Sequence, residues 1–312
     1  MKKPQGWMTT LNAVLRVHNK STALGGKTVS YATQEARRDI LDQGFKELRK
    51  LGYKLPDVNG FKERHMTALG NAWEAKGLSP ATIQNRISVF RVFAEWIGKR
   101  GMIRGSGCYV KNPKAIERHL VTQTDKTWSG QHQTLASKLE TIQQQDKFVA
   151  IQLELQRAFG LRMKEASLLK PHMADKGSYL AINWGTKGGR DRVIPIQTDY
   201  QRDVLTRAKA LLDSPNASMV PRSYDFKQWK NHYYYICREV GISRQDGITS
   251  HGLRHERLNE IYHDIAGVLS PIKGGATHDI DPHLNEAARQ EVAEVAGHSR
   301  YSISGAYLGG EG

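Results

Sequence analysis

Three short segments in the second half of this 312-residue chain carry side chains suited to chemistry on a phosphodiester. They are Gly160-Leu161-Arg162-Met163-Lys164-Glu165, His251-Gly252-Leu253-Arg254-His255 and Gly297-His298-Ser299, the last followed nine residues after its histidine by Tyr307. The guanidinium of an arginine can donate two parallel hydrogen bonds to the non-bridging oxygens of a phosphate. Histidines donate hydrogen bonds or move protons, and a tyrosine can attack phosphorus and form a covalent bond with it. Each segment alone is a weak signal, but their order and spacing together indicate phosphoryl transfer.

The chain is strongly basic, and the excess positive charge is concentrated toward its N-terminal end. It has 46 lysines and arginines against 31 aspartates and glutamates, which gives a formal net charge of +15. Residues 1–125 account for +12 of this charge. Such a surplus is typical of proteins that bind a polyanion such as DNA. Charge alone leaves open the alternative of a merely soluble basic protein.

Cysteine content and hydropathy argue against several classes of protein. Cys108 and Cys237 are too few and too far apart for a disulfide framework or a zinc site. No apolar run approaches the roughly 20 residues needed to span a bilayer, so we expect a cytoplasmic protein with no membrane partner. His251 and His255 are four residues apart and residues 278–283 are rich in potential ligands, but the second histidine of a zinc-protease helix is missing. We therefore predict no metal site.

Hydrophobic periodicity predicts helices in the first half of the chain. Residues 30–52 form one amphipathic, charge-rich pattern, and Ser79-Pro80 opens a second helix that we expect to end at Gly101. The apolar stripe of the second helix is interpreted as core packing. Its polar face carries three candidate DNA-binding residues, Asn85, Arg86 and Arg91. Solvated helix charges are an equally good interpretation of these three side chains.

The second half is predicted to be helical around a small hairpin. A polar linker is expected near 120–130, and the helix that follows ends at Gly160, which leaves Arg162 in the turn behind it. Two strands are predicted, at 179–184 and 191–196, with Lys187 near the hairpin tip. Further helices are expected at 199–212, 225–240, 252–266 and near 284–296.

These elements predict a fold class that is mainly α with a small antiparallel β-sheet (α+β), divided into two domains. Residues 1–125 are expected to form a basic helical domain that grips DNA. Residues 126–312 are expected to form a more balanced enzyme domain with the late tyrosine at its end.

The motifs resemble those of the tyrosine recombinase (phage integrase) family of site-specific DNA recombinases. The resemblance rests on Gly160 to Glu165, Lys187 in the hairpin, the His-x-x-Arg box at 251–254, the Gly-His pair at 297–298 and the spacing to Tyr307. Residues 82–88 look like part of the core-binding domain that precedes the catalytic domain in this family. One departure is the long interval between Arg254 and His298, where residues 267–283 look inserted and are expected to form a surface loop.

The resemblance implies a role for each candidate residue. The implied catalytic residues are Arg162, Lys187, His251, Arg254, His298 and Tyr307, with Glu165 and His255 in support. Tyr307 would attack the scissile phosphate, the two arginines would clamp its non-bridging oxygens, and Lys187 would protonate the departing 5′-oxygen. The two catalytic histidines would bond the phosphate or assist proton movement. Tyr301 is a rival nucleophile in the same segment.

The implied activity is the cutting and rejoining of DNA through a 3′-phosphotyrosyl intermediate, to integrate or excise a mobile element. The implied partner is double-stranded DNA at attachment sites, bound by a homotetramer, with accessory DNA-bending or directionality proteins as further possibilities. The chemistry requires no metal or other cofactor. Two alternatives stay open: a type IB topoisomerase-like relaxing enzyme, and a sequence-specific DNA-binding protein that has lost catalysis.

Overall fold

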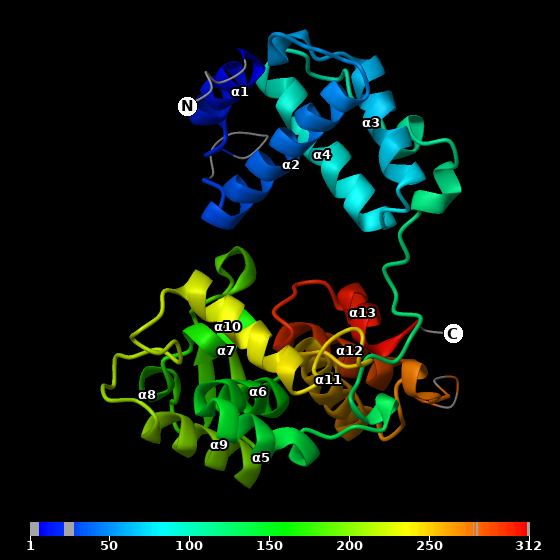
Figure 1. The fold of residues 1–312 in the computed structure, drawn as a ribbon. Coiled ribbons are helices and arrows are strands. Elements are labelled where there is room, and N and C mark those ends of the chain that lie inside the picture. Colours follow the sequence, from blue (N-terminus) through cyan, green and yellow to red (C-terminus); the bar gives the residue numbers. More distant parts are fainter. Residues whose placement is uncertain (1–5, 22–27, 277, 279, 311–312) are drawn as a thin grey trace. The chain divides into compact units, whose positions relative to one another are not determined.

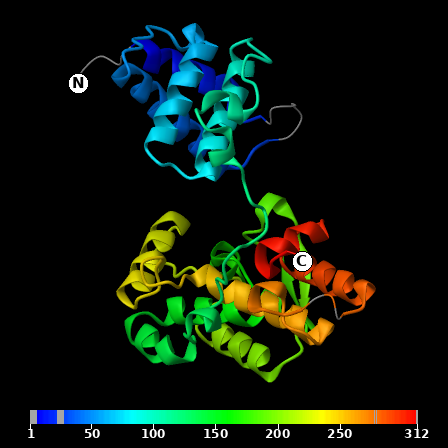
Figure 2. The same ribbon diagram turned by 90° about the vertical axis from the view of Figure 1, so that its right-hand side faces the viewer.

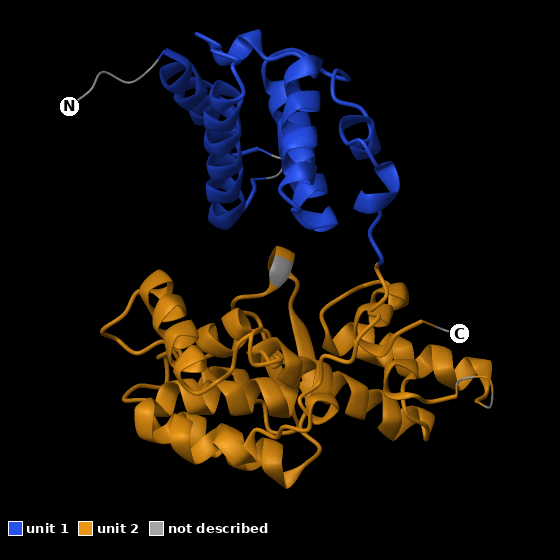
Figure 3. Ribbon diagram, turned by 45° about the vertical axis from the view of Figure 1, so that its right-hand side comes forward, with its two compact units in different colours: residues 1–119 blue, residues 120–312 orange. Residues whose placement is uncertain are grey.

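The computed structural model of the chain describes residues 6–21, 28–276, 278 and 280–310, with the side chain of Lys187 outside the description. The chain folds into two compact units, residues 1–119 and residues 120–312 (Figure 3). We call them unit 1 and unit 2. The division therefore falls after His119 rather than after residue 125, where the change in composition had placed it.

Unit 1 is a small helical bundle (Figure 1). Its helices are α1 (Gly6–His18), α2 (Tyr31–Lys50), α3 (Glu63–Ala75) and α4 (Pro80–Trp96), with short 3-10 turns at Val58–Gly60, Ser106–Tyr109 and Pro113–Ile116. The expected helix over 30–52 is confirmed by α2. Ser79 caps α4 by accepting a hydrogen bond from the Thr82 backbone N–H at 3.3 Å. Because Gly98 adopts a φ of +75°, α4 ends before the expected stop at Gly101.

Aromatic packing forms the core of unit 1. The rings of Phe45, Phe61, Phe90 and Phe93 lie with centroids between 5.2 and 6.3 Å apart, and all four are buried. Gly44 allows this approach, since a Cβ at that position would lie 2.4 Å from the Phe90 ring. The apolar stripe of α4 is thus core, as its periodicity predicted.

Unit 2 is also mainly helical. Its helices are α5 (Ala136–Gln145), α6 (Lys147–Phe159), α7 (Met163–Leu168), α8 (Pro171–Ala174), α9 (Asp199–Ala210), α10 (Phe226–Glu239), α11 (Ser250–Ala266), α12 (Pro282–Val295) and α13 (Gly305–Leu308). Short 3-10 turns occur at Ser129–Gln131, η5 (Lys187–Gly189), η6 (Pro271–Lys273) and η8 (Tyr301–Ser304). The helices expected near 199–212, 225–240, 252–266 and 284–296 are confirmed within two residues at each end. In the described residues, no helix is long and apolar enough to cross a membrane.

Helix α6 lies at the centre of unit 2 and packs against α7, α9 and α11. Three of its polar side chains, Gln152, Glu154 and Gln156, are buried among the apolar ones. Gln152 donates to the Met219 carbonyl at 2.7 Å, and Glu154 pairs with Arg207. The helix ends as expected at Gly160, whose φ of +63° reverses the chain. This reversal places Arg162 at the start of α7.

A two-stranded antiparallel sheet completes unit 2. Strands β1 (Tyr179–Ile182) and β2 (Arg192–Pro195) pair Leu180 with Ile194, and each strand is shorter than the sequence predicted. The pair lies beside α12, as the green strands and orange helix of Figure 2 show. The fold class is therefore the predicted one, mainly α with a small antiparallel sheet.

Candidate active site

Arg162 is held in place by groups on both sides of its guanidinium. Its Nη1 donates to Glu165 Oε1 at 2.7 Å, and its Nη2 donates to the Ala296 carbonyl at 2.7 Å. The same Nη2 lies 3.3 Å from His298 Nε2. The side chain keeps 20% of its surface exposed, so Arg162 can still reach a ligand from solvent.

Glu165 is the buried centre of this cluster. Its carboxylate accepts the Arg162 backbone N–H at 2.8 Å and receives a two-pronged hydrogen bond from Arg192 at 3.0 and 2.8 Å. Burial alone would raise the pKa of this fully buried carboxyl, but the bonds from Arg192 and the charge of Arg162 lower it to about 2. Glu165 is therefore ionised at neutral pH and orients both arginines.

Arg254 lies deeper than Arg162 and is completely buried. It projects from the first turns of α11, donates from Nη1 to the Gly160 carbonyl and donates from Nη2 to the Ala296 carbonyl at 2.6 Å. The Ala296 carbonyl thus accepts from both candidate arginines. Gly297 follows directly with a φ of +69°, and a Cβ there would lie 3.2 Å from Arg192 and 3.4 Å from Arg162. A glycine is needed at this turn for the backbone to wrap the arginines so closely.

Tyr307 lies within the same cluster, on α13. Its hydroxyl oxygen is 3.4 Å from Nε and 3.3 Å from Nη2 of Arg254, both of which donate to it. The ring is also surrounded by imidazoles, with centroid distances of 4.9 Å to His255, 6.3 Å to His251 and 6.5 Å to His298. Tyr307 is 7% exposed, whereas its rival Tyr301 is 42% exposed in η8.

Two histidines in the first turns of α11, His251 and His255, are shifted toward the neutral form. Desolvation, reinforced by the positive charge of Arg254 and Arg162, lowers the pKa of His251 to about 4. His255 is buried beneath it, and desolvation together with neighbouring His251 and Lys126 lowers its pKa to about 3. Neutral imidazoles can accept as well as donate hydrogen bonds, which suits groups that assist proton movement.

A cavity of about 910 Å³ opens beside the tyrosine. His251, His255 and Tyr307 form part of its wall, together with Lys126 and Arg244. Three guanidinium groups around one carboxylate, with neutral histidines beside them, leave a net positive site. Such a site favours a phosphate and the negative charge that develops on its oxygens during transfer.

Arg192 was missed by the sequence reasoning, although it is the strongest partner of Glu165. It lies on β2, is 7% exposed and also donates to the Val295 carbonyl at 2.8 Å. The only signal was a cation next to a hairpin, which is the usual position of a solvated charge. Lys187 lies at the tip of that hairpin in η5, but its side chain lies outside the described residues.

The three candidate DNA-binding residues of unit 1 have different surroundings. Asn85 is exposed beside a groove between α2 and α4. Arg86 is partly exposed and stacks over the Trp73 ring at 5.3 Å. Arg91 instead donates to the backbone carbonyls of Ile103 and Arg104, at 3.2 and 2.7 Å. Arg91 therefore supports a loop of unit 1.

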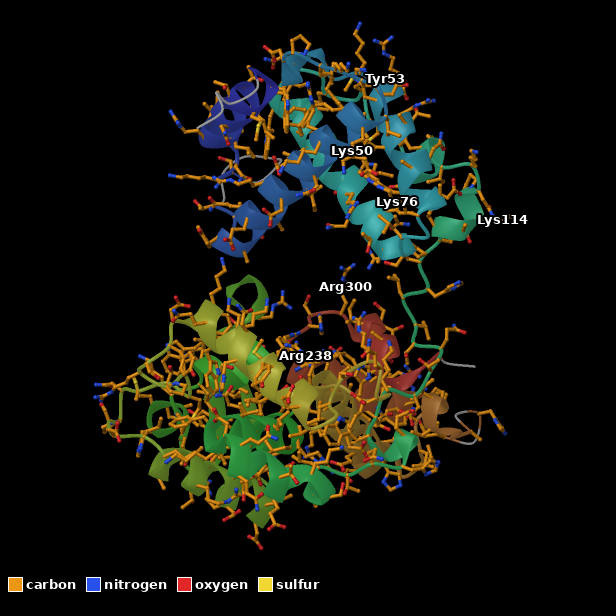
Figure 4. The ribbon with its side chains drawn as sticks, viewed as in Figure 1. Lys50, Tyr53, Lys76, Lys114, Arg238 and Arg300 are labelled. Carbon is orange, nitrogen blue, oxygen red and sulfur yellow. The ribbon has the colours of Figure 1, made fainter. Side chains whose placement is uncertain are left out.

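Unit 1 carries most of the surplus charge. It has 22 lysines and arginines against 9 acidic residues, whereas unit 2 has 24 against 22. Lys50, Lys76 and Lys114 are among the exposed cations of unit 1, and Arg238 and Arg300 are exposed in unit 2 (Figure 4). In the parts of the chain that the structure describes, no group of three or more His, Cys, Asp or Glu residues could hold a metal ion. Asp279, in the ligand-rich stretch 278–283, lies outside those parts.

Solved structures with a similar fold are DNA-bound recombinases. A lambda integrase fragment, solved as a dimer on a core site, matches with a TM-score of 0.60 and 14% identity over 97% of this chain and 95% of that one. The Tn1549 transposon integrase, bound to circular-intermediate DNA, matches with a TM-score of 0.54 and 13% identity over 96% and 95%. A lambda integrase tetramer on a Holliday junction matches with a TM-score of 0.55 and 15% identity over 95% and 78%. At these identities the likeness concerns the fold.

Two family models match the sequence itself. The search of curated protein sequences found no match. The model described as "Phage integrase, N-terminal" matches residues 8–103, and the model described as "Integrase" matches residues 117–260. Because the two matches together span most of the chain, this protein belongs to the phage integrase family, the tyrosine-type site-specific DNA recombinases.

Proposed function

We propose that this protein cuts and rejoins DNA through a covalent bond to Tyr307, and that it thereby integrates or excises a mobile element. One observation carries the proposal: the Tyr307 hydroxyl accepts hydrogen bonds from Arg254, inside the cluster that also contains Arg162 and His298. A nucleophile and the cations that stabilise its transition state are thus contributed by one chain.

The reaction consists of two phosphoryl transfers. The Tyr307 oxygen attacks the scissile phosphorus, forms a 3′-phosphotyrosyl ester and displaces the 5′-oxygen of the neighbouring nucleotide. That oxygen takes a proton and leaves as a 5′-hydroxyl. A 5′-hydroxyl of another duplex then attacks the ester and releases the tyrosine. Because the ester conserves the energy of the broken bond, the strands can be rejoined without ATP.

The arginines and histidines have separate tasks in this proposal. Arg162, which is partly exposed, binds a non-bridging oxygen of the entering phosphate. Arg254 lies beneath it and stabilises the charge that develops between the tyrosine oxygen and the phosphate. His251 and His298 bond the phosphate or pass the tyrosine proton, and His255 supports them from the buried side. Glu165 keeps the arginine forks in their orientation.

The proposed partner is duplex DNA at an attachment site, bound by a multimer. The similar structures support this, since they include a lambda integrase dimer on a core site and a lambda integrase tetramer on a Holliday junction. We propose a tetramer on two duplexes, with accessory DNA-bending or directionality proteins still a prediction. A type IB relaxing enzyme would use the same chemistry as a monomer, whereas a silent DNA-binding protein would have no use for a tyrosine held by Arg254.

The first test traps the covalent intermediate. We expect the wild type to form an adduct with a pool of nicked duplexes whose central sequence is randomised, because the nick lets the 5′-fragment escape before rejoining. Tyr307→Phe should bind the same pool and form no adduct, and Tyr301→Phe should behave as the wild type. An adduct that persists in Tyr307→Phe and vanishes in Tyr301→Phe would move the nucleophile to Tyr301.

A plasmid assay separates a recombinase from a relaxing enzyme. Two plasmids that carry the selected site are incubated with the wild type. Recombinants between them identify a recombinase, whereas relaxed circles alone identify a relaxing enzyme.

The second test concerns the proposed general acid, Lys187. An alkoxide is a poor leaving group without a proton, whereas a thiolate leaves readily as the anion. Lys187→Ala should therefore cleave ordinary DNA about 10²–10⁴-fold more slowly and recover most of that loss when sulfur replaces the bridging 5′-oxygen. Arg162→Ala is the matched control and should recover far less, because its defect lies at the non-bridging oxygens. Equal recovery in both variants, or none in Lys187→Ala, contradicts the assignment.

A further inference from the structure

The segment between α11 and α12 does more than extend a surface loop. Residues 268–275, which we call the brace, include η6 and pack against the chain directly after Tyr307. Gly309 marks the contact: a Cβ there would lie 3.0 Å from the Ile272 nitrogen and 3.4 Å from Pro271 Cβ. Most of this part of 267–283 is exposed or half-buried, as expected of a surface loop, but Ser270 is only 1% exposed.

A chain of hydrogen bonds connects the brace to the backbone of the nucleophile. Ser270 Oγ donates to Asn259 Oδ1. The amide of Asn259 in turn donates to the Tyr307 carbonyl at 3.2 Å and to the His255 carbonyl at 2.8 Å. Asn259 is 3% exposed, so all of these bonds are shielded from water. Asn259 therefore fixes the backbone of Tyr307 and that of His255 relative to each other.

A buried arginine holds the other end of the same short segment. Arg289 on α12 is 2% exposed, and it donates to the Gly309 carbonyl at 3.4 Å and to the Gly310 carbonyl at 3.0 Å. Its Nε also donates to Asn285 Oδ1 at 3.2 Å, which orients the guanidinium from its own helix. Asn259 thus binds the backbone carbonyl of Tyr307, and Arg289 binds carbonyls further along the chain, at Gly309 and Gly310.

The brace is itself anchored at its far end. Lys273 donates to Ser129 Oγ at 2.6 Å, and its Nζ is 3.9 Å from Glu256 on α11. Gly275 closes the turn, because a Cβ there would lie 1.6 Å from the Leu269 carbonyl oxygen. The brace is therefore tied to α11 on one side and to the segment before α5 on the other.

We infer that the brace, through Ser270 and Asn259, and Arg289 are positioning elements that hold Tyr307 within the arginine cluster of its own chain. The inference rests on the proposed function, since it takes Tyr307 as the nucleophile. A four-residue helix such as α13 has little stability of its own, so its orientation depends on tertiary contacts. Loosening these contacts displaces the tyrosine oxygen from the phosphate and leaves the DNA contacts of the arginines intact.

The first measurement is the rate of adduct formation at saturating nicked duplex. Ser270→Ala removes the bond to Asn259, and Arg289→Lys keeps the charge but loses the two-carbonyl grip. We expect each to slow adduct formation by about 10²-fold, the scale of a misplacement near 1 Å, with DNA affinity unchanged. Ser223→Ala, an exposed serine between α9 and α10, is the control and should match the wild type. Melting curves identify a variant that fails to fold. If either Ser270→Ala or Arg289→Lys fails to fold, the rate of the other variant decides the test.

A second measurement detects where the tyrosine goes. Tyr307→Phe, labelled with a small tag, is mixed with Arg162→Ala, which keeps its tyrosine in a damaged site. With an intact brace neither chain supplies what the other lacks, so no adduct forms. When Ser270→Ala is added to the Arg162→Ala chain, its released tyrosine should reach the intact site of the Tyr307→Phe partner and form adduct in trans. A general loss of stability would not produce that gain.

The outcomes separate this inference from the proposed function. If Tyr307→Phe abolishes the adduct, while Ser270→Ala and Arg289→Lys cleave at the wild-type rate and give no adduct in trans, the brace inference alone is overturned. Adduct in trans with an intact brace overturns it as well. An adduct that persists in Tyr307→Phe overturns the assignment of the nucleophile, and the inference with it.

Discussion

The two units of this protein place their arginines in opposite surroundings. In unit 2, Arg162, Arg192 and Arg254 converge on Glu165 and nearby backbone carbonyls, and their side chains are 0–20% exposed. In unit 1 the cations are spread over the surface, and Arg86 and Arg37 stack on tryptophan rings. The total charge of unit 1 is therefore the property that matters for its binding of a polyanion. In unit 2 the important property is the fixed geometry of a few cations.

This difference has a physical consequence for how each unit meets a phosphate. Exposed charges are screened over about 8 Å at physiological ionic strength, and they bind DNA by releasing counterions. Arg162, Arg192 and Arg254 of unit 2, by contrast, have already lost most of their water and most of their freedom. Under the proposed function they need little reorganisation when charge develops on a phosphate, so we expect them to stabilise the transition state rather than the encounter. Salt and mutation should therefore affect the two units differently.

The largest expected effect comes from removing a unit 2 arginine. Arg162→Ala should slow adduct formation in the saturated complex by about 10²–10³-fold, the usual loss for one preorganised donor. Arg91→Ala in unit 1 should leave that rate unchanged, because its guanidinium holds only the carbonyls of its own loop. Rates are measured at two salt concentrations, each time with enough nicked duplex to saturate the protein. Similar losses in the two variants would erase the distinction between the units.

Removing the carboxylate at the centre of the cluster should affect stability more than binding. Glu165→Gln leaves three guanidinium groups without their buried counter-charge, which costs about 3–5 kcal/mol of the free energy of unfolding near pH 7. The pKa of this carboxyl is about 2 in the folded protein and 4.5 as its ordinary value. The stabilisation is therefore complete above about pH 4.5 and is lost as the pH falls toward 2.

Urea unfolding of wild type and Glu165→Gln at several pH values measures this effect. The gap between the two proteins should be widest near neutral pH and should narrow between pH 4.5 and 2, where the wild type takes up the proton. Glu286→Gln, at an exposed position on α12, is the control and should show neither the loss nor the pH dependence. A gap that does not depend on pH would mean that Glu165 acts through its shape and not its charge.

Local sequence rules predicted a good part of the fold and of the site. The helix end at Gly160 and the position of Arg162 behind it follow from the conformational freedom of glycine, which is a local property. The stripe on α4 and the helix breaks around the strands were predicted in the same way. The choice of Tyr307 over Tyr301 came from its spacing to His298, and the structure places Tyr307 against Arg254.

The parts that were not predicted depend on contacts between distant segments. Arg192 reaches Glu165 across 27 residues and Arg289 reaches Gly310 across 21, and neither pair has a spacing that a local pattern could reveal. Ser270 lay in a stretch rich in glycine and proline, which predicts an exposed loop. The structure buries it because Asn259, one helix earlier, presents an amide that needs a partner.

The smallest expected effect, and the sharpest check on unit 1, compares two arginines of one helix. Arg86 and Arg91 both lie on α4, and both were candidate DNA-binding residues in the sequence, with solvated charge as the equal alternative. Only Arg86 keeps its guanidinium on an aromatic surface, where it can bind phosphate, whereas that of Arg91 is committed to two backbone carbonyls. Arg86→Gln should therefore reduce the slope of log affinity against log salt by about 0.9, the value for one lost phosphate contact. Arg91→Gln should leave that slope intact and lower the melting temperature of unit 1, because two carbonyls lose their donor. If the slopes changed in the opposite order, the DNA-binding face of α4 would be the one that carries Arg91.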